Sequence, residues 1–135
     1  MLFGDEHVRK YRETDGQVGH DWNGTQTLII TTTGRKSRKL RDSALIYGRA
    51  GDSPVVVASK GGADEHPDWY QNLTNQPEVE VQIWGDRFPA RARTATGQER
   101  TELWAEMLKH WPDYDEYQTK TDRQIPVVVL DRIAS

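Results

Sequence analysis

The strongest constraint in the chain is a pair of segments that alternate apolar and polar residues on either side of a tight turn. Residues 79–83 place Val, Val and Ile at every second position, and residues 87–93 do the same with Phe and two Ala. A period of two is that of a strand with one buried face. Gly85-Asp86 between the segments favours a reversal. The pattern predicts an antiparallel hairpin, whose sheet must find partners elsewhere in the chain.

Four further segments are rich in β-branched residues and are predicted as strands, at 27–33, 43–49, 55–59 and 125–130. Hairpin-linked strands with few inserted helices indicate an antiparallel sheet, and no Gly-x-Gly-x-x-Gly motif follows a strand to suggest a doubly wound parallel one. Six antiparallel strands can curl into a small barrel, which removes exposed edges. We expect a mainly β (α+β) fold of about six antiparallel strands with two to three helices.

Two helices are expected between the strands. The first carries Asp64 and Glu65 at its positive start and places Trp69 and Leu73 on one face. The second starts with capping-box spacing at residues 96–99, continues as an apolar stripe and stops before a proline. The residues after it form a polar loop that carries two tyrosines.

The 135-residue chain shows no internal repeat and no linker, so one domain is expected. Residues 1–25 are polar and interrupted by glycines, which predicts an N-terminal arm with a short helix near 7–12. Residues 26–135 would form the barrel domain.

Composition excludes several function classes. The chain has no cysteine and no apolar run near the roughly 20 residues of a membrane span, and its start lacks the pattern of a signal peptide. These features indicate a cytoplasmic protein. The net charge of −3 argues against a nucleic-acid partner. The four histidines are scattered without zinc-site spacing, so no metal site is predicted.

Three segments nevertheless carry chemistry. The loop 34–41 holds five cations in seven residues and could surround a phosphate, although a solvated charged hairpin explains it equally well. The glycines of 59–62 let a backbone approach a ligand closely, although a plain strand-to-helix connection would look the same. Trp111, Tyr114 and Tyr117 could sandwich a planar substrate or simply cap the barrel. A bound cofactor fits the lack of a nucleophile motif.

These segments and others occur in one order that resembles a known family. The matching motifs are Gly34-Arg-Lys-Ser with Arg41, Ala58-Ser-Lys-Gly-Gly62, Pro67 to Leu73, Tyr114 to Gln118, Thr121-Asp-Arg123, and Ile125-Pro126. Together they resemble the deazaflavin-dependent nitroreductases of actinobacteria, also described as coenzyme F(420)-dependent quinone reductases. The resemblance covers roughly residues 27–130. It implies a split β-barrel like those of FMN-binding and pyridoxamine-phosphate-oxidase proteins, and a hydride transfer from reduced deazaflavin to a quinone or nitroaromatic acceptor.

The resemblance also implies roles for residues of this sequence. The anionic coenzyme tail would be held by Arg35, Lys36, Ser37 and Arg41. The ring would lie against Asp42, Ser43, Ala44, Leu45 and Ile46, with its edge at Val57, Ala58, Ser59 and Lys60. The first helix would support it through Asp68, Trp69, Tyr70, Gln71 and Asn72. Tyr114 would sit beside the ring as the first choice of proton donor, with Ser59 as the second, and Trp111 and Tyr117 would frame the acceptor.

Two departures from the family pattern concern the acceptor side. Relatives often show a proline and an aromatic residue where this chain has Ala44 and Ile46, and a tyrosine where it has Trp111. Three alternatives stay open beside the reductase: an FMN-binding oxidoreductase on the same barrel, a deazaflavin carrier without turnover, and a nucleic-acid module. Any membrane contact would be peripheral, at the inner face.

Overall fold

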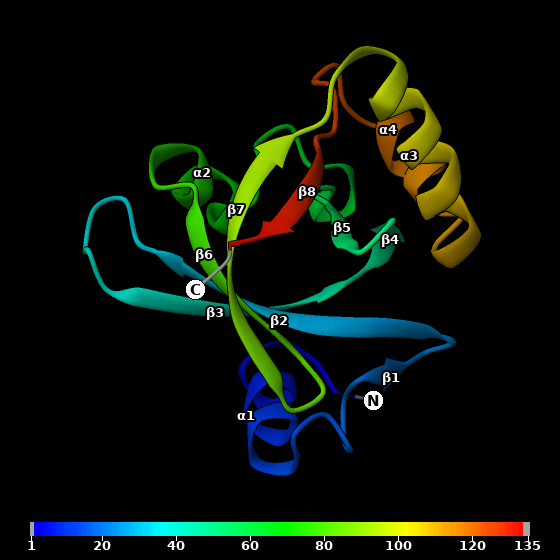
Figure 1. Cartoon of the computed structure of the whole chain (residues 1–135). Coiled ribbons are helices and arrows are strands. Elements are labelled where there is room, and N and C mark those ends of the chain that lie inside the picture. Colours follow the sequence, from blue (N-terminus) through cyan, green and yellow to red (C-terminus); the bar gives the residue numbers. More distant parts are fainter. Residues whose placement is uncertain (1, 134–135) are drawn as a thin grey trace.

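The computed structural model describes residues 2–133 and contains, in that range, four α-helices around a strongly curled antiparallel sheet (Figure 1). The helices are α1 (Gly4–Thr14), α2 (Asp68–Asn75), α3 (Gly97–His110) and α4 (Tyr114–Thr119), with a single 3₁₀ turn η1 (Lys60–Gly62). The strands are β1 (Asp21–Trp22), β2 (Thr25–Thr33), β3 (Leu40–Ile46), β4 (Gly48–Ala50), β5 (Ser53–Val57), β6 (Glu78–Ile83), β7 (Asp86–Thr94) and β8 (Val127–Arg132).

The sheet follows the order β1-β2-β6-β7-β8-β5-β4, and β3 pairs with the remaining side of β2. Strand β3 pairs with β2 and strand β4 pairs with β5, and only Tyr47 separates β3 from β4 in the chain. The β3–β4 segment therefore joins the two ends of the sheet. The barrel therefore has six strand positions, as predicted, with β1 as a two-residue addition. The single strand predicted at 43–49 is wrong in detail: it starts earlier and is divided at Tyr47, whose N–H still donates to the Gln26 carbonyl at 3.0 Å, one position beyond the Thr27–Ile46 pair.

The predicted central hairpin is confirmed as β6 and β7. Its register pairs Ile83 with Asp86, so the reversal is made by Trp84 and Gly85, one residue earlier than expected. Trp84 takes the positive φ of +54° that this tight connection requires.

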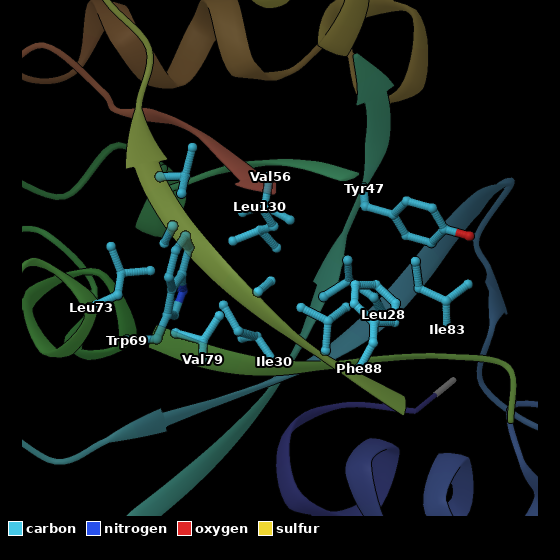
Figure 2. Close-up of a cluster of buried hydrophobic side chains, with 14 of the residues drawn as sticks. Leu28, Ile30, Tyr47, Val56, Trp69, Leu73, Val79, Ile83, Phe88 and Leu130 are labelled. Carbon is cyan, nitrogen blue, oxygen red and sulfur yellow. The ribbon is translucent and has the colours of Figure 1, made fainter. Parts of the chain in front are cut away.

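The buried side chains form two groups, one on each side of the sheet. The first fills the barrel and includes Leu28, Ile30, Val81 and Leu130 together with Trp69 of α2. Figure 2 shows this group, with Trp69 beside Val79 at the α2 end. The second lies between the barrel and the helices α3 and α4 and consists of Val55, Val57, Ala95, Leu103, Met107, Tyr114, Ile125, Val127 and Val129. The apolar stripe predicted for the second helix is thus confirmed, because Leu103 and Met107 are buried in this second group.

Helix starts differ from the sequence-based expectations in two places. Helix α2 begins at Asp68 after Pro67, so Asp64 and Glu65 precede the helix, and Glu65 pairs instead with Lys60 at 3.3 Å. Helix α3 begins after Thr96 as predicted, but the Thr96 side chain makes no capping bond. Short-range sequence signals located both helices without fixing which side chains bond there.

Further differences lie at the two ends of the chain. The polar loop expected after α3 contains the short helix α4. The short helix expected in the N-terminal arm is present as α1, which packs on the sheet (Figure 1). The buried Tyr11 hydroxyl donates to the Thr27 carbonyl and accepts from the Trp84 N–H, both at 3.0 Å, and burial raises the pKa of Tyr11 to about 12. Within residues 2–133, no helix has the length and apolar composition needed to cross a bilayer.

Candidate active site

Of the hollows that adjoin strand β3, two contain most of the predicted site residues. The larger, here called the aromatic hollow, has a volume of about 520 Å³. The smaller, here called the basic hollow, has a volume of about 430 Å³. Ser43 on β3 lines both of them, so they meet at this residue.

The aromatic hollow gathers residues from strands, turns and helices that are far apart in the sequence. Ten of the residues predicted for the site line it: Asp42, Ser43, Ala44, Leu45, Ile46, Val57, Ser59, Trp111, Tyr114 and Tyr117. Five consecutive residues of β3 line it, because within residues 2–133 this strand pairs only with β2 and borders the hollow along its other edge. The departures Ala44 and Ile46 therefore replace a proline and an aromatic ring in the wall of this hollow.

The aromatic side chains at one end of the hollow hold each other in place. The Trp111 Nε1–H donates to the Tyr117 hydroxyl at 3.3 Å, and the Tyr114 and Tyr117 rings meet edge to face at 6.2 Å between centroids. Tyr114 is only 4% exposed, and its burial, with Tyr117 beside it, raises its pKa well above the ordinary value of 10. At neutral pH this phenol keeps its proton and can only donate it in a hydrogen bond or transfer it to a strong base.

The N-terminal arm supplies a wall that sequence reasoning missed. Leu2, Phe3, Gly4, Asp5, His7, Val8 and Trp22 line the hollow, as do Thr27 and Gly61. Trp22 lies 6.0 Å from Trp111 between ring centroids and donates its Nε1–H to the Leu2 carbonyl at 2.7 Å. The arm is fixed to β3 because the Arg12 guanidinium donates to Asp42 at 3.1 Å. No local signal marked these residues, since the contacts join segments from about 20 to about 90 positions apart.

The basic hollow collects the residues predicted to bind an anion. It is lined by Gly34, Arg35, Lys36, Ser37, Arg41 and Ser43 from the β2–β3 hairpin, and by Asp68, Trp69 and Asn72 from α2. The hairpin extends away from the barrel (Figure 1). Two backbone hydrogen bonds close its tip: the Gly34 N–H donates to the Lys39 carbonyl at 2.8 Å, and the Gly34 carbonyl accepts from the Arg38 N–H at 2.9 Å.

The cations of this hollow are not equivalent. Arg35 is bound to α2, donating to Asn72 at 2.9 Å and to Asp68 at 3.3 Å. Lys36 and Arg41 have no carboxylate within ion-pairing distance in the part of the chain that the structure describes. Arg35 thus braces the hairpin, and Lys36 and Arg41 keep their charge available to a ligand.

Four predicted residues line neither hollow. Ala58 is fully buried in the barrel, and Lys60 pairs with Glu65. The Tyr70 hydroxyl bonds to the Thr94 hydroxyl at 2.8 Å, and the Gln71 amide donates to the His66 carbonyl at 2.9 Å. The roles expected for these four residues stay predictions.

The two hollows are suited to different parts of a ligand. The aromatic hollow can hold flat rings and presents hydroxyl groups at Ser43, Ser59, Tyr114 and Tyr117. The basic hollow can hold an anion through Lys36, Ser37 and Arg41. Among residues 2–133 no cluster of three or more His, Asp or Glu could hold a metal ion.

Comparison with known proteins identifies relatives of the whole chain. A family model described as F(420)H(2)-dependent quinone reductase matches residues 4–132. An F(420)H(2)-dependent quinone reductase of Mycobacterium tuberculosis is 38% identical over an alignment of 130 residues, and the match covers 93% of this chain and 87% of that protein. The solved structure of an F(420)H(2)-dependent reductase is 42% identical, with a TM-score of 0.72 over 78% of this chain and 93% of its own.

A more distant likeness concerns the fold alone. A Listeria innocua protein named as a pyridoxamine 5′-phosphate oxidase is 13% identical and covers 93% of both chains with a TM-score of 0.58. The predicted split β-barrel is thereby confirmed. With a family model that spans nearly the whole chain, this protein belongs to the F(420)H(2)-dependent quinone reductase family.

Proposed function

We propose that this protein binds the deazaflavin coenzyme F(420) across the two hollows and reduces a quinone with it. The observation that carries the proposal is that Ser43 lines both hollows, so that a hollow suited to flat rings adjoins one that offers free cations. A ligand with a planar ring and a phosphorylated, glutamate-bearing tail fits both surfaces at once. The names of the relatives support the same coenzyme.

The basic hollow fits the tail by charge and by position. Lys36 and Arg41 would bind the phosphate and the first carboxylate, with the Ser37 hydroxyl as a further donor. Arg35, held by Asn72 and Asp68, would keep the hairpin in place. The chain is acidic overall, so this local group of cations is the part of the surface that attracts an anionic ligand.

The aromatic hollow fits the ring and the acceptor together. Its volume of about 520 Å³ lies within the usual range of about 300–1,000 Å³ for small-molecule sites. We place the ring along β3 and the acceptor between Trp111, Tyr117 and the wall made by Trp22. When bound in its reduced form, the coenzyme supplies a hydride.

The residues around the acceptor would bind and orient it and stabilise the charge that it gains. The Tyr114 phenol is protonated at neutral pH even at its ordinary pKa of 10, and burial, which raises that pKa, makes loss of the proton harder, so Tyr114 is a hydrogen-bond donor rather than an acid. The Ser59 hydroxyl is the second candidate donor. Trp22, Trp111 and Phe3 would exclude water from the reacting groups.

The test is a pair of fluorescence titrations, one with coenzyme F(420) and one with FMN, followed by steady-state oxidation of the reduced coenzyme with menadione. The proposal predicts micromolar binding of the deazaflavin, much weaker binding of FMN, and turnover. Tight binding of FMN alone would instead identify a flavin enzyme. Binding without turnover, with either quinones or nitroaromatic compounds, would identify a carrier.

We also propose that the protein reaches membrane-dissolved quinones through peripheral contact. Phe3, at the aromatic hollow, and Leu40, in the basic hairpin, are 66% and 72% exposed. Co-sedimentation with vesicles that contain a long-tailed quinone should therefore weaken when both are changed to Ser. Equal sedimentation of the Phe3→Ser/Leu40→Ser variant would contradict this contact.

A further inference from the structure

The turn between β5 and α2 takes an unusual backbone path where it borders the aromatic hollow. Three successive residues, Lys60, Gly61 and Gly62, have positive φ angles of +46°, +63° and +86°. Lys60 pays a conformational cost there because its side chain disfavours the left-handed region. Ser59 and Gly61 of this turn line the hollow, so the path decides where the Ser59 side chain lies.

One side chain from elsewhere in the sequence holds this turn. The Arg123 guanidinium donates from Nε to the Ala63 carbonyl at 2.7 Å, from Nη2 to the Ser59 carbonyl at 2.8 Å, and from Nη1 to the Ala58 carbonyl at 3.2 Å. Its Nη1 also lies 3.0 Å from the His66 Nδ1. The planar fork therefore binds the turn at both ends, which a single ammonium group could not do.

The backbone of Arg123 is itself fixed to α4. The Gln118 side chain donates to the Arg123 carbonyl at 2.7 Å and accepts from the Ile125 N–H at 2.9 Å. On the other side, Gly62 approaches the Tyr117 backbone so closely that a Cβ would lie 2.6 Å from the Tyr117 carbonyl oxygen. The turn and the helix of the tyrosines are thus joined through Arg123.

We propose that Arg123 is a positioning residue for the reduction: it fixes the 58–63 turn against α4 and so sets Ser59 and Tyr114 at their places in the aromatic hollow. Arg123 lines neither hollow, so it acts through these residues and does not touch the ligand. This inference rests on the proposed function for its kinetic consequence only. The fixed turn can be measured without any coenzyme.

The experiment compares Arg123→Ala with Arg123→Lys and with a matched control, Arg100→Ala. Arg100 is also partly buried and also donates to a backbone carbonyl, that of Ile125 at 2.6 Å, but it does not contact the turn. Trypsin cleavage after Lys60 in the folded, coenzyme-free protein, followed by mass spectrometry, reports the turn directly. We expect cleavage at least 10-fold faster in both Arg123 variants and unchanged in Arg100→Ala.

In turnover, Arg123→Ala should lower kcat about 10-fold while the coenzyme Kd stays within threefold, and added methylguanidinium should restore part of kcat. Arg100→Ala should keep kcat within twofold even where its Tm falls equally. Unchanged cleavage at Lys60 in the Arg123 variants would overturn the proposal. A fall in kcat that is proportional to the fall in Tm in Arg123→Ala and in Arg100→Ala alike would overturn it as well. If the wild type fails to oxidise the coenzyme, the proposed function fails, and the cleavage result still decides whether Arg123 fixes the turn.

Discussion

The aromatic hollow and the basic hollow share Ser43 and differ in almost everything else. The basic hollow is built from one hairpin and one helix, and its cations are close together in the sequence. The aromatic hollow draws its walls from α1, β1, β2, β3, β5, η1, α4 and Trp111, the residue that follows α3. The basic hollow gathers its positive charge from one short segment of the chain. The aromatic hollow needs the closed barrel, because its walls come from segments spread along the whole sequence. The difference suggests that coenzyme affinity and acceptor choice can be changed separately.

The largest effect should follow from removing the free cations. Lys36→Ala with Arg41→Ala removes two charge-assisted contacts, each worth about 1.5–3 kcal/mol, so the coenzyme Kd should rise about 100-fold or more in a fluorescence titration. A deazaflavin without the phosphorylated tail should have the same Kd for the wild type and for the Lys36→Ala/Arg41→Ala variant. Arg38→Asn with Lys39→Ala removes the same charge from the same loop outside the hollow, and should change Kd by less than fivefold. Equal losses in the two double variants would mean that only net charge matters.

The next effect concerns the opposite hollow. Tyr114→Phe keeps the ring and removes the hydroxyl, so kcat for menadione reduction should fall about 10- to 100-fold, the scale of a lost donor to a developing oxyanion. The coenzyme Kd should stay within twofold. Stopped-flow oxidation of the reduced coenzyme measures the step directly. A larger fall in Ser59→Ala than in Tyr114→Phe would move the donor role to Ser59.

A smaller effect should follow at the wall that the N-terminal arm provides. Trp22→Ala opens the contact with Trp111, so KM for the quinone should rise about fivefold, which corresponds to about 1 kcal/mol of lost apolar contact. Trp22→Phe should retain most of the affinity. Steady-state kinetics with menadione checks both. A change in coenzyme Kd without a change in KM would place the ring, rather than the acceptor, against Trp22.

The smallest effect concerns pH and stability. Burial, and secondarily the Arg123 charge, lower the pKa of His66 below its ordinary 6.5, so the folded protein favours the neutral ring. Its contribution to stability is fully present above pH 6.5 and is lost as pH falls below that value. His66→Asn keeps an acceptor for Arg123 but does not titrate. The loss in Tm from pH 7.5 to pH 5 should therefore be smaller in this variant, and an equal loss would contradict the assignment.

How much the sequence could predict differs between the two hollows for the same physical reason. Alternation in β6 and β7, the apolar stripe of α3 and the clustered cations are local patterns, so they located the barrel and the basic hairpin. The division of the predicted 43–49 strand at Tyr47 is where the chain passes from pairing with β2 to pairing with β5. No periodicity in the sequence marks this change of partner.

The wall of the N-terminal arm was missed for a related reason. Trp22 meets Trp111 after β1 has paired with β2, while Tyr11 and Arg12 hold the neighbouring helix α1 on the sheet. The hydrogen bonds from Arg123 to the 58–63 turn likewise join segments some 60 residues apart. Contacts of this kind are a property of the closed fold, and the sequence pattern contains no trace of them.

The most direct measurement is a crystal structure of the protein with coenzyme F(420) bound. The account predicts the phosphate within hydrogen-bonding distance of Lys36 and Arg41, and the ring along β3 facing Tyr114. A ring bound outside the aromatic hollow, or a tail that leaves Lys36 and Arg41 without contact, would contradict it.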